Sequence, residues 1–303
     1  ILSIKEFPKS MIIAGAGVIG SEYACIFAHM GIKVHLLNRH SEILNFVDKD
    51  LRELLTKEMK NDGIIFHSNV ELEKIKKTKE GKVSVQLNNG VELEAAMLLY
   101  CMGRNGNTKN LKLDAIKLKT EKYDLLKVNK NYQTTIKNIY AVGDVVGYPS
   151  LASVSAQQGT IAVKDILNLP INSIPELFPY GIYTVPEMSF VGKSETELNE
   201  EGTPFVTGIA DYREVARGQI QGMVKGLLKM HIHKETLKVL GIHIVGYGAT
   251  EIIHIGQAVL TFGGDVTYFT NNVFNYPTLA EAYKTAAFSA YNQVPEEIKL
   301  KYQ

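Results

Sequence analysis

The stretch GAGVIG from Gly15 to Gly20 has the spacing GxGxxG, which can bind the diphosphate of a dinucleotide. The apolar run SMIIA before it predicts a strand, and the residues from about Val18 to Met30 predict a helix. In such a turn Gly15 permits the sharp bend, Gly17 lets the diphosphate approach the backbone, and Gly20 lets helix and strand pack closely. The helix then directs its amides and positive dipole end at the phosphates. The sequence therefore predicts a dinucleotide site at this turn.

The end of the next strand, KVHLL, indicates which coenzyme this site accepts. An acidic residue there binds the ribose 2′-hydroxyl of NAD and repels the 2′-phosphate of NADP. Here Asn38 takes that position, and Arg39 and His40, which can bind a phosphate, follow it. We expect NADP to be tolerated and NAD to remain possible through the neutral Asn38, with a solvated surface arginine and histidine as the alternative.

Glu22 is a further candidate on the helix after the glycines. We place it in the first turn, where the helix dipole favours a carboxylate. The carboxylate of Glu22 can therefore serve either the stability of the helix or a function at the site.

Composition limits the partners of the chain. Its 303 residues include 33 Lys and Arg against 32 Asp and Glu, so the large basic surface of a nucleic-acid-binding or membrane-binding protein is not expected. Apolar runs fall short of the roughly 18 residues of a membrane helix, and no charged-then-apolar leader opens the sequence. We expect a cytoplasmic protein whose partners are small molecules or other subunits.

Cysteines and histidines give no second site. Cys25 and Cys101 are too far apart in sequence for a CxxC or CxxxxC redox pair. His231 and His233 could share one face of a strand, but no third ligand accompanies them, so no metal is expected.

The elements around these residues fall into three regions. Strands and helices alternate in the first third, which predicts a parallel sheet, followed by an antiparallel hairpin that turns at Asn89-Gly90 and by the buried strand AAMLLYCMG. The middle region carries the strand NIYAVGD and a helix from about Ala152 to Leu167. Residues 181–295 predict an α+β region with the strands LLKMHIH and KVLGIHIVG and helices near 249–262 and 279–291.

The segment TIKNIYAVGDVVG, together with GRNGNT and GIYTVPEMSFVGKSE, resembles the flavin-dependent pyridine nucleotide disulfide oxidoreductase superfamily. By that resemblance Asp144 contacts the ribityl chain of FAD, and the helix that follows points its N-terminus at the flavin. The resemblance implies these further cofactor-binding residues: Gly103, Arg104, Ser150, Leu151 and Ala152.

Within the superfamily the chain is most similar to the soluble transhydrogenases, through VGYPSLASVSAQQG, EIIHIGQAVL and FNYPTLAEAY. The resemblance implies hydride transfer between NADPH and NAD through FAD. It places Glu22 near the nicotinamide, and Arg39 and His40 at the 2′-phosphate. Asn45 stands where NADP-using relatives carry another arginine, so we expect this cluster alone to bind NADP more weakly.

Tyr276-Pro277-Thr278, with Glu281 further on, takes the place of a His-Pro-Thr-x-x-Glu motif in the disulfide-reducing members. That histidine is the proton shuttle for a dithiol, whereas tyrosine, with an ordinary pKa of about 10, is a poor shuttle at neutral pH. Hydride exchange through a flavin needs no such shuttle. The candidate residues at the reaction site are therefore Glu22, Tyr276 and Glu281. We expect Tyr276 to pack or shape the flavin face and Glu281 to have no catalytic role.

The resemblance also implies the domain organisation. We expect an α/β Rossmann-like NAD(P)-binding domain over 1–112, the C-terminal part of an FAD-binding domain over 113–177, and an α+β dimerisation domain over 178–303 that forms a homodimer. Because the FAD fingerprint of the family precedes these domains, we expect the chain to be the C-terminal two-thirds of a longer enzyme. Alone it should hold FAD weakly or not at all and lack transhydrogenase activity. A dihydrolipoamide dehydrogenase-like disulfide reductase and a non-catalytic NAD(P)-binding and dimerisation module remain as alternatives.

Overall fold

The computed structural model describes residues 1–171 and 177–302. Packing divides the chain into two compact units. One consists of Ile1–Met102 together with Pro179–Gln303, and the other of Gly103–Phe178. The first unit thus joins most of the first and third expected domains, and the expected domain limits stay predictions.

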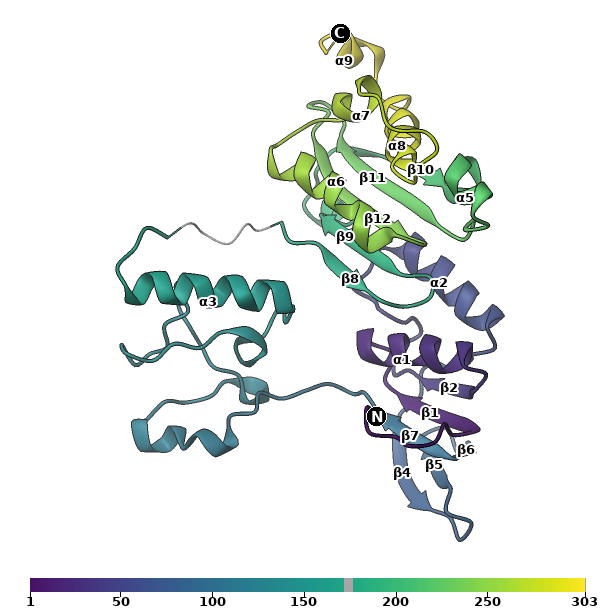
Figure 1. The fold of residues 1–303 in the computed structure, drawn as a ribbon, viewed down its shortest axis with the longest axis vertical. Coiled ribbons are helices and arrows are strands. Elements are labelled where there is room, and N and C mark those ends of the chain that lie inside the picture. Colours follow the sequence, from purple (N-terminus) through teal and green to yellow (C-terminus); the bar gives the residue numbers. More distant parts are fainter. Residues whose placement is uncertain (172–176, 303) are drawn as a thin grey trace. The chain divides into compact units, whose positions relative to one another are not determined.

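A parallel sheet with the order β3-β2-β1-β7 organises the N-terminal part of the first unit (Figure 1). In its centre, Ala14 of β1 lies opposite Leu37 on one side and Tyr100 on the other. The strands are β1 Ser10–Ala14, β2 Lys33–Leu37, β3 Ile65–His67 and β7 Met97–Tyr100. The helices between them are α1 Val18–His29 and α2 Lys49–Asn61. The expected Rossmann-like sheet is confirmed.

The central strand β1 is apolar along its length because both of its faces are covered. Met11 and Ile13 belong to a core that includes Leu51 of α2, while Ile12 belongs to a second core with Val85 on the opposite face. This double burial fixes the end of β1, and with it the start of the glycine turn.

The second face is covered by an antiparallel sheet of β4 Leu72–Lys77, β5 Val83–Leu87 and β6 Glu92–Ala95. Gln86 pairs with Glu92 across the turn, in which Gly90 has a φ of 83°. The hairpin expected at Asn89-Gly90 is therefore confirmed.

The strand β7 differs from its expected position. It forms an edge of the parallel sheet, and Tyr100 is 61% exposed. The prediction of a buried strand was wrong because an apolar sequence does not reveal whether a strand has neighbours on both sides.

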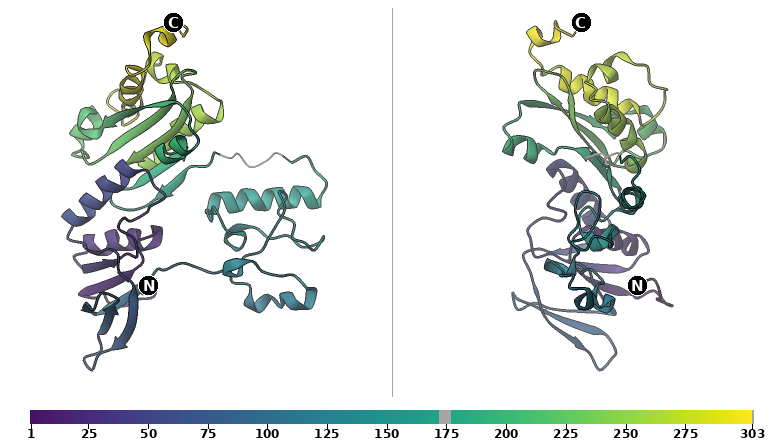
Figure 2. Two further views of the ribbon diagram at one scale, coloured as in Figure 1. Left: turned by 180° about the vertical axis from the view of Figure 1, so that it is seen from behind. Right: turned by 90° about the vertical axis from the view of Figure 1, so that its left-hand side faces the viewer.

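The C-terminal part of the first unit is built on an antiparallel sheet with the order β10-β11-β12-β9-β8. These strands are β8 Tyr180–Ile182, β9 Met188–Gly192, β10 Phe205–Asp211, β11 Leu227–His233 and β12 Val239–Val245. The helices α6 Ala249–Thr261 and α8 Glu281–Tyr291 lie on one side of it (Figure 2), joined by a hydrogen bond from Gly256 N to Tyr283 Oη. Helix α2 packs against β12. The expected α+β region is confirmed.

Shorter helices complete this part of the chain. They are α4 Glu195–Glu200, α5 Ala216–Ile220, α7 Thr267–Asn271, α9 Glu296–Lys299 and the 3-10 turn η5 Tyr212–Glu214. Across residues 1–171 and 177–302, no helix has the length and apolar character needed to span a bilayer.

The second unit has little regular structure apart from α3 Ala152–Ile166, which agrees with the expected helix. Its 3-10 turns are η1 Lys109–Leu111, η2 Leu113–Ile116, η3 Lys122–Asp124 and η4 Gly143–Val146. The expected strand NIYAVGD is wrong, because within the described part of this segment only Tyr140 forms a bridge, to Gln133. A β-like sequence needs a paired neighbour to form a strand, and the described part of this unit supplies only isolated bridges.

Candidate functional site

The glycine turn begins at the carboxyl end of β1, between β2 and β7, and its first and third glycines are structurally required. Gly15 has a φ of 105°, and a Cβ there would lie 2.7 Å from Cys101 O. A Cβ on Gly20 would lie 1.8 Å from Gly15 O. The roles expected for these glycines in the bend and in helix–strand packing therefore match the geometry.

Gly17 differs from the other two because space beside it is open. A Cβ at this position would meet no described atom within 4 Å, and Gly17 precedes α1 without a side-chain cap. The first-turn amides of α1 are thus free of a capping side chain at the positive end of the helix dipole. These features fit a diphosphate, the group expected here.

Asn38, Arg39 and His40 form the rim of the turn at the end of β2. Asn38 is 7% exposed, and its Nδ2 donates to Glu42 O at 2.7 Å. Arg39 is exposed and its Nε lies 2.9 Å from Glu71 Oε1, and His40 is also exposed. An exposed ion pair of this kind contributes little, so Arg39 is available to an anionic ligand.

Beside the rim, a cavity of about 460 Å³ lies between the segment after β2 and helix α2. Ser41, Glu42 and Arg52 line it, but none of the glycines does. This hollow follows α2, and Asn38, Arg39 and His40 do not line it either.

Glu22 lies in the second turn of α1, so the expected placement in the first turn was wrong. The dipole at the helix start therefore does not explain this carboxylate. Its Oε1 accepts a hydrogen bond of 2.8 Å from the backbone N of Tyr183, just after β8. Sequence reasoning missed Tyr183 because 161 residues separate the two.

In the second unit, Arg104 and Asp144 form an ion pair with a distance of 3.0 Å between Nη1 and Oδ2. Both side chains are more than half exposed. Gly103, the neighbour of Arg104, has a φ of 100° and open space around it. The structure thus brings together two residues that the resemblance assigned separately to the cofactor.

Ser150, Leu151 and Ala152 form the entry to α3. Ser150 Oγ donates to Gly147 O at 2.9 Å, and Leu151 precedes the helix without a side-chain cap. Ala152 is the first helical residue, so this helix start, like that of α1, leaves amides available to a polar ligand. The uncapped start and the exposed carboxylate of Asp144 are the donors and acceptor that a flavin with a ribityl chain requires, so these residues fit the group.

Gln158 on α3 is a residue that sequence reasoning missed in this segment. Its Oε1 accepts from Gly143 N at 2.7 Å, directly before Asp144. Gly143 and Gln158 are 15 positions apart in the sequence, so no short-range pattern predicts this contact.

Tyr276 and Glu281 do not form a pair. Tyr276 is 74% exposed, whereas Glu281 Oε2 accepts from Thr278 N at 3.3 Å. The expected packing of Tyr276 therefore stays a prediction, and Glu281 instead binds the backbone just before α8, a helix without a side-chain cap.

Comparison with known protein families gave two matches. The model described as pyridine nucleotide-disulphide oxidoreductase matches residues 1–159, and the dimerisation-domain model of the same family matches residues 178–287. Together they extend over both compact units.

Two curated relatives carry the name soluble pyridine nucleotide transhydrogenase. The protein from Sodalis glossinidius is 46% identical over 298 residues, and that from a Marinomonas species is 43% identical over 297 residues. Each alignment covers 97% of this chain and 64% of the relative. The chain thus spans slightly less than two-thirds of the length of these proteins.

Solved structures give the same picture. LpdA from Mycobacterium tuberculosis matches with a TM-score of 0.88 and 25% identity, covering 95% of this chain and 63% of that one. The HOCl-induced flavoprotein disulfide reductase RclA from Escherichia coli matches with a TM-score of 0.90 and 25% identity, covering 95% and 66%. With a family model matched over more than half of its length, the chain belongs to the pyridine nucleotide-disulphide oxidoreductase family.

Proposed function

We propose that this chain binds NADPH and NAD at the turn from Gly15 to Gly20, and that it serves hydride transfer between them through FAD. The carrying observation is the open, uncapped start of α1 at Gly17. Support also comes from relatives named soluble pyridine nucleotide transhydrogenase that share up to 46% identity with the chain.

Each candidate residue of the first unit then has a role in holding the coenzyme. The amides at the start of α1 hold the diphosphate next to Gly17. Asn38, Arg39 and His40 meet the adenosine ribose, where the absence of a carboxylate among them admits both NADP and NAD. Glu22, fixed by the amide of Tyr183, orients the nicotinamide end.

The second unit contributes Gly103, Arg104, Asp144 and the start of α3 at Ser150, Leu151 and Ala152 as flavin-binding residues. When bound, FAD supplies a hydride acceptor and donor between the two nicotinamides. Arg104 orients the Asp144 carboxylate, and the first amides of α3 donate to the ring. The weak binding of FAD by this chain alone stays a prediction.

Tyr276 supports hydride transfer over dithiol reduction. A disulfide reductase needs a group that moves a proton to and from a thiol near neutral pH. At Tyr276 the phenol is exposed, and the carboxylate of Glu281 is engaged by Thr278 instead. A disulfide-reductase activity therefore has less support from this chain.

A homodimer through residues 178–287 is part of the proposal, because the matching model there is a dimerisation domain. Large apolar side chains lie exposed in that region, including Phe262 at 88% and Val273 at 95%. A cytoplasmic location is proposed with it.

Calorimetry with NADPH and with NADH tests the binding function, and reduction of thio-NAD by NADPH in the presence of FAD tests the activity. We expect both nucleotides to bind. Binding without turnover would favour either the nucleotide-binding module or the expected inactive portion of a longer enzyme, and reduction of lipoamide by NADH would favour the disulfide reductase. No binding of either nucleotide would refute the proposal.

A further inference from the structure

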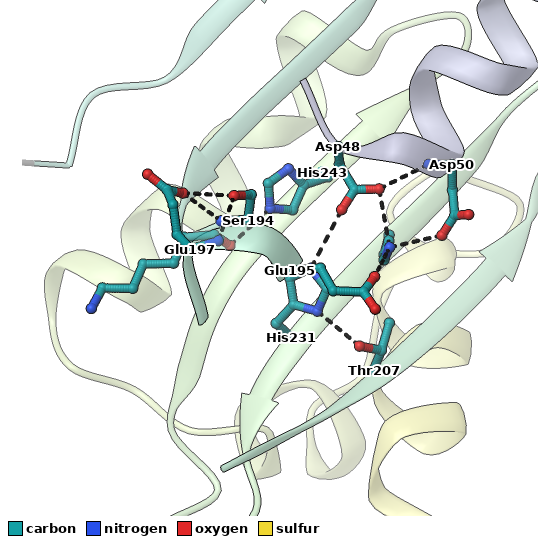
Figure 3. A network of polar contacts seen from close by, with 10 residues as sticks. Asp48, Asp50, Ser194, Glu195, Glu197, Thr207, His231 and His243 are labelled. Carbon is teal, nitrogen blue, oxygen red and sulfur yellow. Dashed lines mark hydrogen bonds and ion pairs between the residues drawn. The ribbon is translucent and has the colours of Figure 1, made fainter. Parts of the chain in front are cut away.

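A cluster of charges around the buried Lys229 joins the start of α2 to the five-stranded antiparallel sheet (Figure 3). Lys229 of β11 is 1% exposed, and its ammonium lies 3.0 Å from Asp48 Oδ1, 2.7 Å from Asp50 Oδ2 and 2.5 Å from Glu195 Oε2. Asp48 and Asp50 belong to the start of α2, whereas Glu195 begins α4. One side chain of the antiparallel sheet thus holds the first turn of a helix from the Rossmann-like part.

Two buried histidines line the same cluster. His231 Nδ1 lies 2.9 Å from Thr207 Oγ1, and His243 Nε2 lies 2.9 Å from the backbone oxygen of Lys193. Their rings meet edge to face with centroids 5.3 Å apart. His231 Nε2 is 3.8 Å from Asp48 Oδ2, which is too long for a hydrogen bond, so Lys229 provides the direct contacts that hold Asp48.

Asp48 ends the segment 38–48, which we call the rim loop because it begins with the rim residue Asn38. Asp48 Oδ1 accepts from Asp50 N at 3.1 Å and so caps α2. Within the loop, Leu44 N donates to Ala16 O of the glycine turn at 3.4 Å. The rim loop therefore connects the buried cluster directly to the backbone around Gly17.

A second contact fixes the same loop to the antiparallel sheet. Phe46 packs edge to face on Tyr180 of β8 with ring centroids 5.8 Å apart, and lies 6.3 Å from the ring of Phe190. The sheet thus holds the rim loop at Phe46 and at Asp48, two residues apart.

We propose that Lys229 is a positioning residue for the pyridine nucleotide: by holding Asp48 it fixes the rim loop against the glycine turn. This inference rests on the proposed nucleotide-binding function. Lys229 does not touch the nucleotide, and its effect passes through the backbone from Asp48 to Asn38 and Ala16. The affinity for NADPH and NAD therefore depends on a side chain of the antiparallel sheet.

The substitution Lys229→Met tests this, with Lys225→Met as the matched control. Lys225 also joins α2 to the antiparallel part, through Glu58 at 2.5 Å, but it does so at the opposite end of the helix. Hydrogen exchange of the amides of residues 38–47 and the Kd for NADPH are measured for both variants of the full chain. We expect Lys229→Met to speed exchange in the rim loop more than in β1 and to weaken NADPH binding by about five- to tenfold, and Lys225→Met to do neither.

Equal behaviour of the two variants, or faster exchange in β1 to the same extent as in the loop, would overturn the proposal. If Lys229→Met fails to fold, the double variant Asp48→Asn/Lys229→Met decides, because it also removes the ion pair that holds the rim loop but leaves no buried carboxylate without a cation. Unchanged loop exchange in that variant refutes the positioning role. An unmodified chain that binds no nucleotide refutes the proposed function, whereas loop exchange still decides the role of Lys229.

Discussion

Replacing Lys229 by methionine should destabilise the first unit strongly, because it leaves the carboxylate of Asp48 buried without its cation. Both side chains are 1% exposed. Burial alone would disfavour the ammonium, but its hydrogen bonds with Asp50 and Glu195 and the charge of Asp48 raise the pKa of Lys229 above its ordinary value. Burial likewise opposes the charge on Asp48, yet the neighbouring His231, His243 and Lys229 hold its pKa well below the ordinary range.

The size of the effect follows from the distance of 3.0 Å between Lys229 Nζ and Asp48 Oδ1. At an effective dielectric constant of about 20, two unit charges at that distance attract with about 5 kcal/mol before desolvation. Breaking one partner of a buried pair costs about 3–5 kcal/mol. For a unit of this size such a loss lowers the melting temperature by roughly 6–20 °C.

Thermal melts and urea titrations followed by circular dichroism measure this loss. The double variant Asp48→Asn/Lys229→Met should recover part of it, because asparagine keeps an oxygen to cap α2 and leaves no buried charge. Lys225→Met should cost less than Lys229→Met, since the side chain of Lys225 is 59% exposed, although that of its partner Glu58 is 9% exposed. If Lys229→Met matched the unmodified chain, or the double variant were less stable than the single one, the reasoning would be refuted.

The other predictions concern the glycine turn, the rim and pH. Gly20→Ala should lower the melting temperature, because its Cβ would lie 1.8 Å from Gly15 O, whereas Gly17→Ala should keep stability and reduce NADPH affinity in calorimetry. Arg39→Ala should weaken binding of NADPH more than that of NADH without changing the melting temperature by more than about 2 °C. Burial and the nearby histidine lower the pKa of His243 from 6.5 to about 4. Because the unfolded chain takes up this proton at a higher pH than the folded chain, the free energy of unfolding should fall by about 3 kcal/mol between pH 6.5 and pH 4. Urea titrations between these pH values should show a smaller loss in His243→Asn; equal losses would contradict this.

Local patterns were enough to predict much of the fold. The apolar stretch SMIIA, the glycines at 15 and 20, and the helix that follows them each obey a short-range rule, and the structure agrees with them. NIYAVGD has the same strand-like composition but lacks neighbouring strands within the described residues, so composition alone misled. The strand β10 was not singled out, because Gly208 interrupts FVTGIAD.

The candidate site shows the same division. The spacing of the glycines and the position of Asn38 could be read locally, whereas the partners of the functional side chains could not. Glu22 meets Tyr183 across 161 residues, and Lys229 meets Asp48 across 181 residues. Contacts over such separations depend on how the sheets pack, which no periodicity in one chain encodes.

The most direct test of the central claim is to follow the backbone amide resonances of the chain during titration with NADPH. We predict saturable shifts concentrated at Gly17 and at Val18 and Ile19, the first residues of α1, because their amides would donate to the diphosphate. Shifts that leave these three amides unchanged, with NADPH bound elsewhere or not at all, would contradict the account.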